Sequence, residues 1–317
     1  MTALPLLDAE ELRTLSGLAR RALWAPPSVR AALQAQNVNI TPANFYSAIP
    51  SIAEIDRSWE HRRPGEEVFN GGLFDPPALA AWLDRLAPFA DEFDPPLDPP
   101  DPKDGGAPAF HWRNPAFSYS DALAYYCTIR ALQPEGIVEV GAGFSTLIAD
   151  LALRRNGHGR LTVIEPWPKP FLRKLETIGS LIEEPVQDVP LARLVGLVEE
   201  AGLWFIDSTH TVKSGSDCLW LYLKAMPALS REVVVHSHDI FLPFGFPKGP
   251  MQEKQIYWTE QYLLYAYLLD NPRAEVLFSS AYGTARMADR LGAFMGGKYP
   301  MGGGSIWYRI RPKREAA

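Results

Sequence analysis

The sequence predicts a doubly wound α/β fold with a mainly parallel sheet and an antiparallel last strand. Short apolar runs alternate with helix-like segments between residues 137 and 238, which is typical of consecutive βαβ units. The first run ends in a glycine turn that leads directly into a helix-like segment. We expect strands at 137–140, 161–165, 181–183, 203–207, 232–238, 275–279 and 305–311, and helices at 120–132, 145–155, 169–178, 189–200, 216–227 and 252–269, with a glycine-rich loop before the last strand.

The residues before this pattern predict a smaller, mostly helical segment. Apolar residues recur at helical spacing from Asp8 to Trp24, and Pro76 begins another helical stretch. Residues 94–108 are rich in Pro and Asp and hold few apolar side chains, as linkers do. We therefore predict a helical N-terminal segment (1–93), a linker (94–108) and an α/β domain (109–317).

The composition describes an acidic chain that can form a sizeable core. Of its 317 residues 47% are hydrophobic, and the net charge is −6. This charge disfavours nucleic acid as a main partner. No apolar run approaches the length of a membrane span, and the acidic N-terminus is unlike a signal peptide. Since Cys127 and Cys218 lie in helix-like segments, we expect no disulfide framework and a cytoplasmic location. The oligomeric state stays open.

The segment Ile137–Thr146 has the features of a nucleotide-type binding turn. Gly141 permits a sharp turn, and Gly143 removes a side chain where a ligand would approach. A dinucleotide fingerprint needs a third glycine at the position of Thr146, so this helix start suits a pyrophosphate poorly. Glu165 follows the second strand, where a carboxylate can accept hydrogen bonds from ribose hydroxyls. The turn favours a nucleoside without a pyrophosphate.

Polar residues follow the fourth and fifth predicted strands. Asp207 and His210 come after the fourth strand, and His236, His238 and Asp239 end the fifth. Because the carboxyl ends of parallel strands share one edge of a sheet, we expect both groups near the glycine turn. Imidazole beside carboxylates suits proton transfer or a divalent ion. Since side chains alternate along a strand, the two histidines should face away from Asp239, which argues against one ion held by all three.

Simpler interpretations remain open for these residues. Asp207 could cap the helix that follows, and Glu165 could cap a local turn. His210, His236 and His238 could be histidines whose hydrogen bonds are satisfied within the fold. Further along the chain, aromatic residues around Glu260 could either shape an acceptor pocket or pack a helix on the sheet.

The order of these features resembles the class I S-adenosylmethionine-dependent methyltransferases. It is most similar to a branch, mostly of uncharacterised bacterial proteins, whose fourth strand ends in Ile-Asp-x-x-His and whose fifth ends in His-Asp, as 206–210 and 238–239 do here. An acidic residue ends the second strand, and Asp188 follows the third. The resemblance covers about residues 110–312 and implies a Rossmann-like sheet.

The resemblance implies S-adenosylmethionine as the cofactor. Glu139, together with the two glycines, would form the turn on the methionine side. Glu165 would hold the ribose, and Asp188 would meet the adenine amino group. The residues that would close over the cofactor precede the fold, and they are Asn114, Tyr119 and Ser120.

The resemblance also implies methyl transfer to a small molecule, with oxygen as the expected acceptor atom. His210 would act as the base toward a substrate hydroxyl. Asp207 and Asp239 would bind the substrate or a divalent ion, for which Mg²⁺ is the first candidate and His238 a further ligand. This chain has Ile240 where metal-dependent relatives commonly carry another polar ligand.

Other functions fit the same residues. A metal-dependent hydroxylase, or another oxidative enzyme on this scaffold, would use the His and Asp residues at the strand ends. A nicotinamide oxidoreductase is disfavoured by Thr146. A non-catalytic nucleoside-binding protein would keep the turn and lack turnover.

Overall fold

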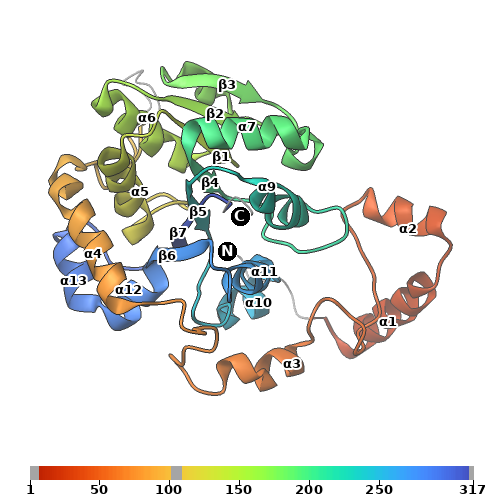
Figure 1. The fold of residues 1–317 in the computed structure, drawn as a ribbon. Helices are drawn as coiled ribbons and strands as arrows, with labels where there is room; N and C mark the ends of the chain where they lie inside the picture. Colours follow the sequence, from red (N-terminus) through yellow and green to blue (C-terminus); the bar gives the residue numbers. More distant parts are fainter. Residues whose placement is uncertain (1–6, 101–108, 314–317) are drawn as a thin grey trace. The chain divides into compact units, whose positions relative to one another are not determined.

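The chain divides into two compact units, Met1–Ser58 and Trp59–Ala317. The structure, a computed structural model, describes residues 7–100 and 109–313. The first unit holds helices α1 (Ala9–Leu23), α2 (Pro27–Gln34) and α3 (Ile52–Arg57). The second unit contains the sheet and all the candidate site residues named above (Figure 1).

Local sequence signals explain the helices of the first unit. The Asp8 carboxylate accepts from the backbone N–H groups of Glu10 and Glu11, and the Glu11 carboxylate accepts from the backbone N–H of Asp8. This reciprocal capping satisfies donors that a helix start otherwise leaves free. Ser51 and Glu54 form the same arrangement at the start of α3. The helix expected from Asp8 to Trp24 is confirmed.

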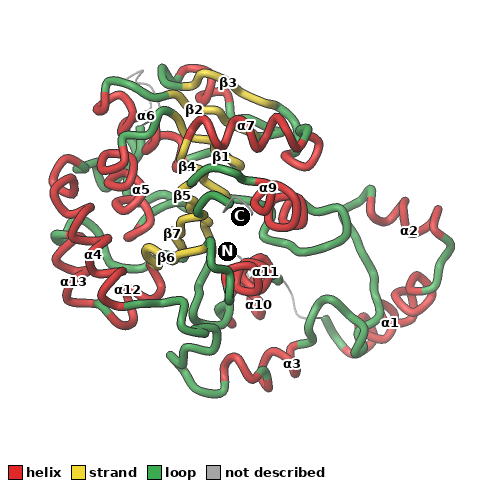
Figure 2. Tube along the Cα trace, viewed as in Figure 1, coloured by secondary structure: helices red, strands yellow, loops and turns green. Residues whose placement is uncertain are grey.

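The described part of the second unit contains a seven-stranded sheet in the order β3-β2-β1-β4-β5-β7-β6. Strands β1 to β5 pair in parallel, whereas β7 is antiparallel to both β5 and β6. Figure 2 shows the strands as a band between helices. The strands are β1 (Gly136–Val140), β2 (Arg160–Ile164), β3 (Ile178–Ile182), β4 (Gly202–Ile206), β5 (Val233–His238), β6 (Ala274–Ser279) and β7 (Ser305–Ile310). The predicted doubly wound sheet with an antiparallel last strand is confirmed.

Helices cover both faces of the sheet. The helices of this unit are α4 (Pro76–Leu86), α5 (Tyr119–Leu132), α6 (Phe144–Asn156), α7 (Leu191–Ala201), α8 (Asp217–Trp220), α9 (Met226–Ala228), α10 (Lys248–Lys254), α11 (Glu260–Leu268), α12 (Ser280–Arg286) and α13 (Ala288–Met295). On β4, Leu203 and Phe205 enter the core formed with α4, α5, α6 and α13, whereas Trp204 and Ile206 enter the core formed with α7 and α11. A strand buried on both faces needs apolar residues at successive positions, which explains the continuous apolar runs of the sequence.

The structure corrects the expected helix at 169–178. Only a short 3₁₀ turn, Pro170–Lys174, forms there, and β3 begins at Ile178. Prolines at 166, 168 and 170 lack the N–H groups that an α-helix needs and disfavour helical geometry in the residues before them. The expected strand at 181–183 is correspondingly longer and begins earlier.

The glycine-rich segment before β7 is also more ordered than expected. Residues 280–295 form α12 and α13, and Ser279 caps α12 by accepting from the backbone N–H of Tyr282. Leu291, Phe294 and Met295 bury the inner face of α13. The single helix expected at 252–269 is divided into α10 and α11, because Gln255 takes a left-handed conformation that ends α10.

The division between the units lies earlier than the linker expected at 94–108. Helix α4 buries Leu79, Trp82, Leu83 and Leu86 in the second unit, so this part of the expected N-terminal segment belongs to the packed α/β domain. Residues 101–108 of the expected linker lie outside the described residues.

Both cysteines, Cys127 and Cys218, are buried free thiols. Within the described residues, no helix has the length and apolar character needed to cross a membrane.

Candidate functional site

The candidate site lies at the carboxyl edge of the parallel strands. Strand β1 lies between β2 and β4, and β5 follows β4. Backbone pairing continues just past the strand ends, because Gly141 N–H donates to Ile164 O at 3.0 Å and Asp207 N–H donates to Val140 O at 2.8 Å. The turn after β1 is thereby held beside the residues that follow β2 and β4.

The two glycines of the turn, Gly141 and Gly143, differ in what the structure requires of them. Gly141 has φ of +82°, and a side chain on it would place its Cβ 2.3 Å from the backbone oxygen of Asp207. This position therefore requires glycine. Gly143 begins α6 and has open space where a Cβ would stand. The space beside the helix start is available to a ligand, as the sequence predicted.

A cavity of about 330 Å³ lies between the ends of β1, β2 and β4. Its lining includes Gly141, Glu165, Gln187 and Asp207. Glu165 is partly buried, and one of its oxygens, Oε1, accepts from Trp167 N–H at 2.9 Å. Glu165 thus lines the cavity beside the glycine turn, and its contact with the ribose stays a prediction.

The contact predicted between Asp188 and the adenine amino group stays a prediction. Asp188 ends a 3₁₀ turn, Val186–Asp188, is exposed, and is not part of the cavity lining. Its neighbour Gln187 lines the cavity instead. A 3₁₀ turn rotates successive side chains by about a third of a circle, so adjacent residues face different sides, and the sequence pattern does not decide which one faces the ligand.

Glu139 is a fully buried carboxyl group on β1. Its Oε1 accepts from the Tyr125 hydroxyl at 2.8 Å, and Oε2 has no hydrogen-bond partner among the described residues. Burial raises the pKa of Glu139 to about 7, although the Thr146 and Tyr125 hydroxyl groups beside the carboxyl oppose that rise. A buried oxygen without a partner directly before the glycine turn fits a cationic ligand group such as an ammonium.

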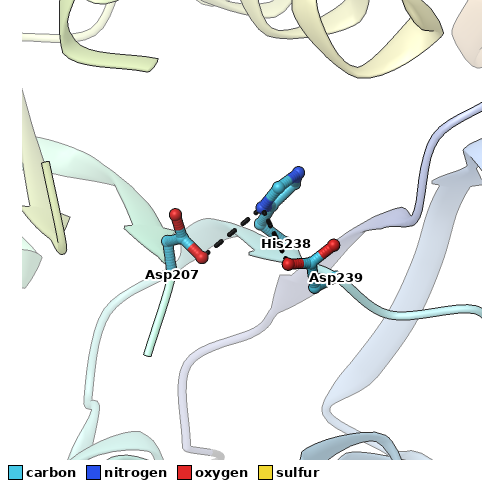
Figure 3. Close-up of side chains that lie close together, drawn as sticks. All are labelled: Asp207, His238 and Asp239. Atoms are coloured by element: carbon cyan, nitrogen blue, oxygen red, sulfur yellow. Dashed lines mark hydrogen bonds and ion pairs between the residues drawn. The ribbon is translucent and has the colours of Figure 1, made fainter. Parts of the chain in front are cut away.

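Asp207, His238 and Asp239 converge in a single cluster (Figure 3). One ligand atom from each lies within 4.8 Å of the others. His238 Nδ1 is 3.4 Å from Asp207 Oδ1 and 3.8 Å from Asp239 Oδ2. Separations of this size leave a common position for one divalent ion among the three atoms.

This convergence corrects the expectation that strand alternation would separate Asp239 from His238. β5 ends at His238, and Asp239 has φ of +55°. The left-handed backbone at Asp239 ends the extended alternation and returns its carboxylate to the side of His238. Strained backbone of this kind is concentrated at functional sites.

His210 is held between carboxylates from two elements. Its Nδ1 lies 2.7 Å from Glu260 Oε2, and its Nε2 lies 3.1 Å from Asp207 Oδ1 and 3.6 Å from Asp239 Oδ2. His210 also has a left-handed backbone, with φ of +58°. The backbone oxygen of His210 accepts from the N–H groups of Thr259 and Glu260, so the loop after β4 is fastened to the start of α11.

Glu260 is a buried acidic residue for which the sequence predicted no role beyond its place among aromatic residues at a helix start. Its carboxylate is 1% exposed and accepts from His210, from the Ser208 hydroxyl at 2.7 Å and from the Tyr222 hydroxyl. Glu260 is 50 residues beyond His210 in the chain. The sequence carries one signal of this role, a carboxylate placed among aromatic residues at a helix start.

The histidines and carboxylates of this network shift one another's pKa values. Burial disfavours a charge on His210, but its hydrogen bonds to Asp207 and Glu260 outweigh burial and raise its pKa to about 10. Burial likewise opposes ionisation of Asp207, yet His238 and His210 hold the pKa of Asp207 well below its usual range. Burial raises the pKa of Asp239, even though His238 and His210 oppose that rise. The carboxylates around His210 therefore favour its protonated form.

The remaining predicted residues have mainly structural contacts. Asn114 holds the loop before α5, since its Nδ2 donates to His111 O and Phe117 O and its Oδ1 accepts from Phe117 N–H. Ser120 Oγ accepts from Gly302 N–H at 3.1 Å and is fully buried. Tyr119 is 44% exposed, and its ring lies against that of Tyr299. These residues fasten the start of α5.

His236 is a buried histidine with a partner on Nε2 and none on Nδ1 among the described residues, and Asp207 does not cap a helix. Burial keeps the pKa of His236 well below its usual value, and its Nε2 pairs with the Ser305 hydroxyl at 2.8 Å. The cap of α8 is Ser216, which accepts from Leu219 N–H. The Asp207 carboxylate is thus free to join the cluster with His210 and His238.

Comparison with known proteins places this chain in a family. Residues 138–240 match the family described as "Methyltransferase domain". An uncharacterized protein of Archaeoglobus fulgidus is 35% identical over 159 residues, which cover 48% of this chain and 70% of that protein. The matched domain contains the glycine turn and every ligand atom of the Asp207, His238 and Asp239 cluster.

Solved structures of methyltransferases are similar to the chain at lower identity. A methyltransferase of Podospora anserina with SAH bound is 13% identical, with 99% of this chain and 100% of that chain covered and a TM-score of 0.37. An O-methyltransferase of Bacillus cereus in complex with SAH is 10% identical, with 75% and 92% covered and a TM-score of 0.36. From the domain match, the strand order and the ligand-sized cavity at the glycine turn, we conclude that the chain belongs to the class I S-adenosylmethionine-dependent methyltransferases.

Proposed function

We propose that this methyltransferase transfers its methyl group to a hydroxyl oxygen of a small molecule, and that the acceptor binds at His210. The observation that carries the proposal is the position of the His210 imidazole, whose Nδ1 is held by Glu260 and whose Nε2 faces the Asp207 and Asp239 carboxylates. One nitrogen is anchored, and the other is directed at the cluster beside the cofactor cavity.

The cofactor residues are assigned from what each can bind. The bound cofactor supplies a methyl group on a positively charged sulfur, which becomes a neutral thioether when the methyl leaves. The unpartnered Oε2 of Glu139 suits the cofactor's ammonium group, and the open space at Gly143 suits its methionine arm. Glu165 suits the ribose hydroxyls. We assign Gln187, which lines the cavity, in place of Asp188 as the residue that contacts the adenine of the cofactor.

His210 is assigned the proton of the acceptor hydroxyl. An acceptor oxygen bound at Nε2 would replace the Asp207 contact there, and that contact is one of those that raise the pKa of His210. Loss of that contact lowers the pKa of the imidazole, which favours the neutral form that can act as the base. Removing the hydroxyl proton increases the nucleophilicity of the oxygen, and holding it in line with the methyl group increases the rate further.

The Asp207, His238 and Asp239 cluster is assigned a divalent ion. The three donor atoms lie within 4.8 Å of one another, which fits a single ion. When bound, the ion supplies positive charge that stabilises a deprotonated acceptor oxygen. Asp207 also lines the cofactor cavity, so the acceptor and the cofactor would meet at this side chain.

The test begins with S-adenosylhomocysteine titrated into the purified full chain by calorimetry. We expect one site per chain, and absence of binding would overturn the cofactor assignment. Methyl transfer is then measured from radiolabelled S-adenosylmethionine to a panel of phenols, catechols and sugars and to a second panel of amines and carbon acids. Labelled methyl on nitrogen or carbon acceptors only would contradict the O-methylation proposal.

One observation favours the oxidative alternative. His238 adds a nitrogen donor to two carboxylates, and such mixed sets bind redox-active iron in other enzymes. Oxygen consumption by the iron-loaded protein in the presence of a panel compound, without methyl transfer, would favour the hydroxylase over our proposal.

A further inference from the structure

We propose that Asp121 fixes the His238 ring so that Nδ1 serves as a nitrogen ligand, which makes the cluster selective for a first-row transition ion over Mg²⁺. This proposal rests on the ion site proposed above. It assigns a positioning role to a residue outside the cluster, and it changes the expected metal from magnesium to an ion such as Mn²⁺ or Zn²⁺.

The two nitrogens of His238 lie in different surroundings. Nε2 is 3.6 Å from Asp121 Oδ2, on the side of α5. Nδ1 is directed at Asp207 and Asp239, at 3.4 Å and 3.8 Å. The His238 side chain is only 7% exposed, and its ring lies against that of Phe117 with centroids 4.8 Å apart, so it has little room to turn.

Asp121 is itself held rigidly. It lies in the first turn of α5, is 2% exposed, and accepts from Gly304 N–H at 3.0 Å. Gly303 has φ of +101°, and a Cβ there would lie 2.3 Å from both carboxylate oxygens of Asp121. The loop before β7 therefore encloses this carboxylate without a side chain of its own.

The remaining oxygen of Asp121 is unusual for a structural residue. Oδ1 is buried and has no hydrogen-bond partner among the described residues. A carboxylate that served only to anchor Gly304 would not require a second buried oxygen, because an amide could accept that one hydrogen bond. Its charge is matched instead by the neighbouring imidazole of His238.

The contact supports metal binding at one particular nitrogen. Without an ion both nitrogens face a carboxylate, since Asp207 lies 3.4 Å from Nδ1 and Asp121 lies 3.6 Å from Nε2. When an ion takes the lone pair of Nδ1, the ring proton lies on Nε2, where Asp121 can accept it. A carboxylate behind a metal-binding histidine orients the ring and increases its basicity. Imidazole nitrogen suits Zn²⁺ and other transition ions, whereas Mg²⁺ prefers six oxygen ligands.

The experiment titrates Zn²⁺, Mn²⁺ and Mg²⁺ separately into the metal-free full chain, as wild type and as Asp121→Asn. We expect the wild type to bind Zn²⁺ and Mn²⁺ more tightly than Mg²⁺. In Asp121→Asn an amide oxygen at the Oδ2 position can still accept from Gly304 and face Nε2, but the negative charge that increases the basicity of the ring is lost. Affinity for Zn²⁺ and Mn²⁺ should fall by about 10- to 100-fold, while Mg²⁺ binding changes little.

A matched control is Asp150→Asn. Asp150 is also a buried aspartate on a helix, and it accepts from Arg154 on α6 and from Thr177 in the loop before β3. It should leave the metal affinities unchanged. A second measurement does not depend on any variant: Mn²⁺ bound to the wild type should show electron–nuclear coupling to a directly bound nitrogen.

Three results would overturn the proposal: equal Mg²⁺ and Zn²⁺ affinity in the wild type, unchanged Zn²⁺ affinity in Asp121→Asn, or no nitrogen coupling. Titration of S-adenosylhomocysteine distinguishes failure of the Asp121 proposal from failure of the proposed function. Asp121→Asn should bind it as the wild type does, and failure of the wild type to bind it would count against the cofactor site alone.

Discussion

The two halves of the sheet edge are built in opposite ways. The cofactor half, after β1 and β2, contains an open cavity lined by Glu165, and next to the glycine turn Glu139 has a buried oxygen without a hydrogen-bond partner among the described residues. The other half, after β4 and β5, is a closed network in which each nitrogen of His210 and His238 already faces a carboxylate. The edge after β1 and β2 can therefore receive a ligand, whereas the edge after β4 and β5 keeps charged groups in fixed positions before a ligand arrives.

The largest expected effect comes from removing the imidazole at the centre of the closed half. His210→Gln should lower kcat for methyl transfer by about 10²- to 10⁴-fold, because it removes the proposed base. The affinity for S-adenosylhomocysteine, measured by calorimetry, should stay within about threefold of wild type. If His210→Gln lost affinity for S-adenosylhomocysteine as well as kcat, the cofactor site and the His210 network would not act independently.

At Glu139 we expect the ionised carboxylate to lower the stability of the fold and to increase the affinity for the cofactor. The folded-state pKa of about 7 lies above the ordinary value of 4.5, so folding takes up a proton between these values and stability decreases as the pH rises through them. At pH 8 the ionised carboxylate destabilises the fold by about 3 kcal/mol at most.

Glu139→Gln should therefore be more stable than wild type at pH 8 and about equally stable at pH 4.5 in urea unfolding experiments. It should also bind the cofactor more weakly, since the amide cannot pair with an ammonium group by charge. A variant whose stability advantage does not depend on pH would contradict this account.

Glu260 tests whether the closed half acts through orientation. Glu260→Gln should lower kcat by about 10- to 100-fold with little change in KM, because the amide no longer holds the His210 ring as a charged acceptor does. Tyr222→Phe is the control, since it removes another hydrogen bond to the same carboxylate and leaves the His210 contact in place. Equal losses in both variants would indicate a general packing defect.

The smallest expected effects distinguish two acidic residues of the open half. Glu165→Ala should weaken cofactor binding by about tenfold or more, as expected for a charged acceptor of hydroxyl groups. Asp188→Ala should have no measurable effect, because Asp188 is exposed and lies outside the cavity lining. A strong effect of Asp188→Ala, measured by the same titration, would restore the original assignment of the adenine ligand.

Much of the fold was readable because it depends on local patterns. The alternation of apolar strands and helices predicted the parallel sheet, and the position after each strand predicted which residues share its edge. Asp207, His210 and Asp239 were correctly expected near one another. The errors were local as well: the prolines from 166 to 170 prevented a helix, and the many glycines before β7 concealed two helices.

The sheet, the glycine turn and the residue types at the sheet edge could be predicted from the sequence, because each follows from periodicity or from backbone constraints within a few residues. Only the tertiary structure decided that Glu260 holds His210, that Asp121 faces His238 and that Gln187 rather than Asp188 lines the cavity. Those contacts join residues about 50 to more than 100 positions apart or depend on the rotation of one short turn. Neither a long-range contact nor such a rotation leaves a periodic signal in the chain, since both are set by how helices pack on the finished sheet.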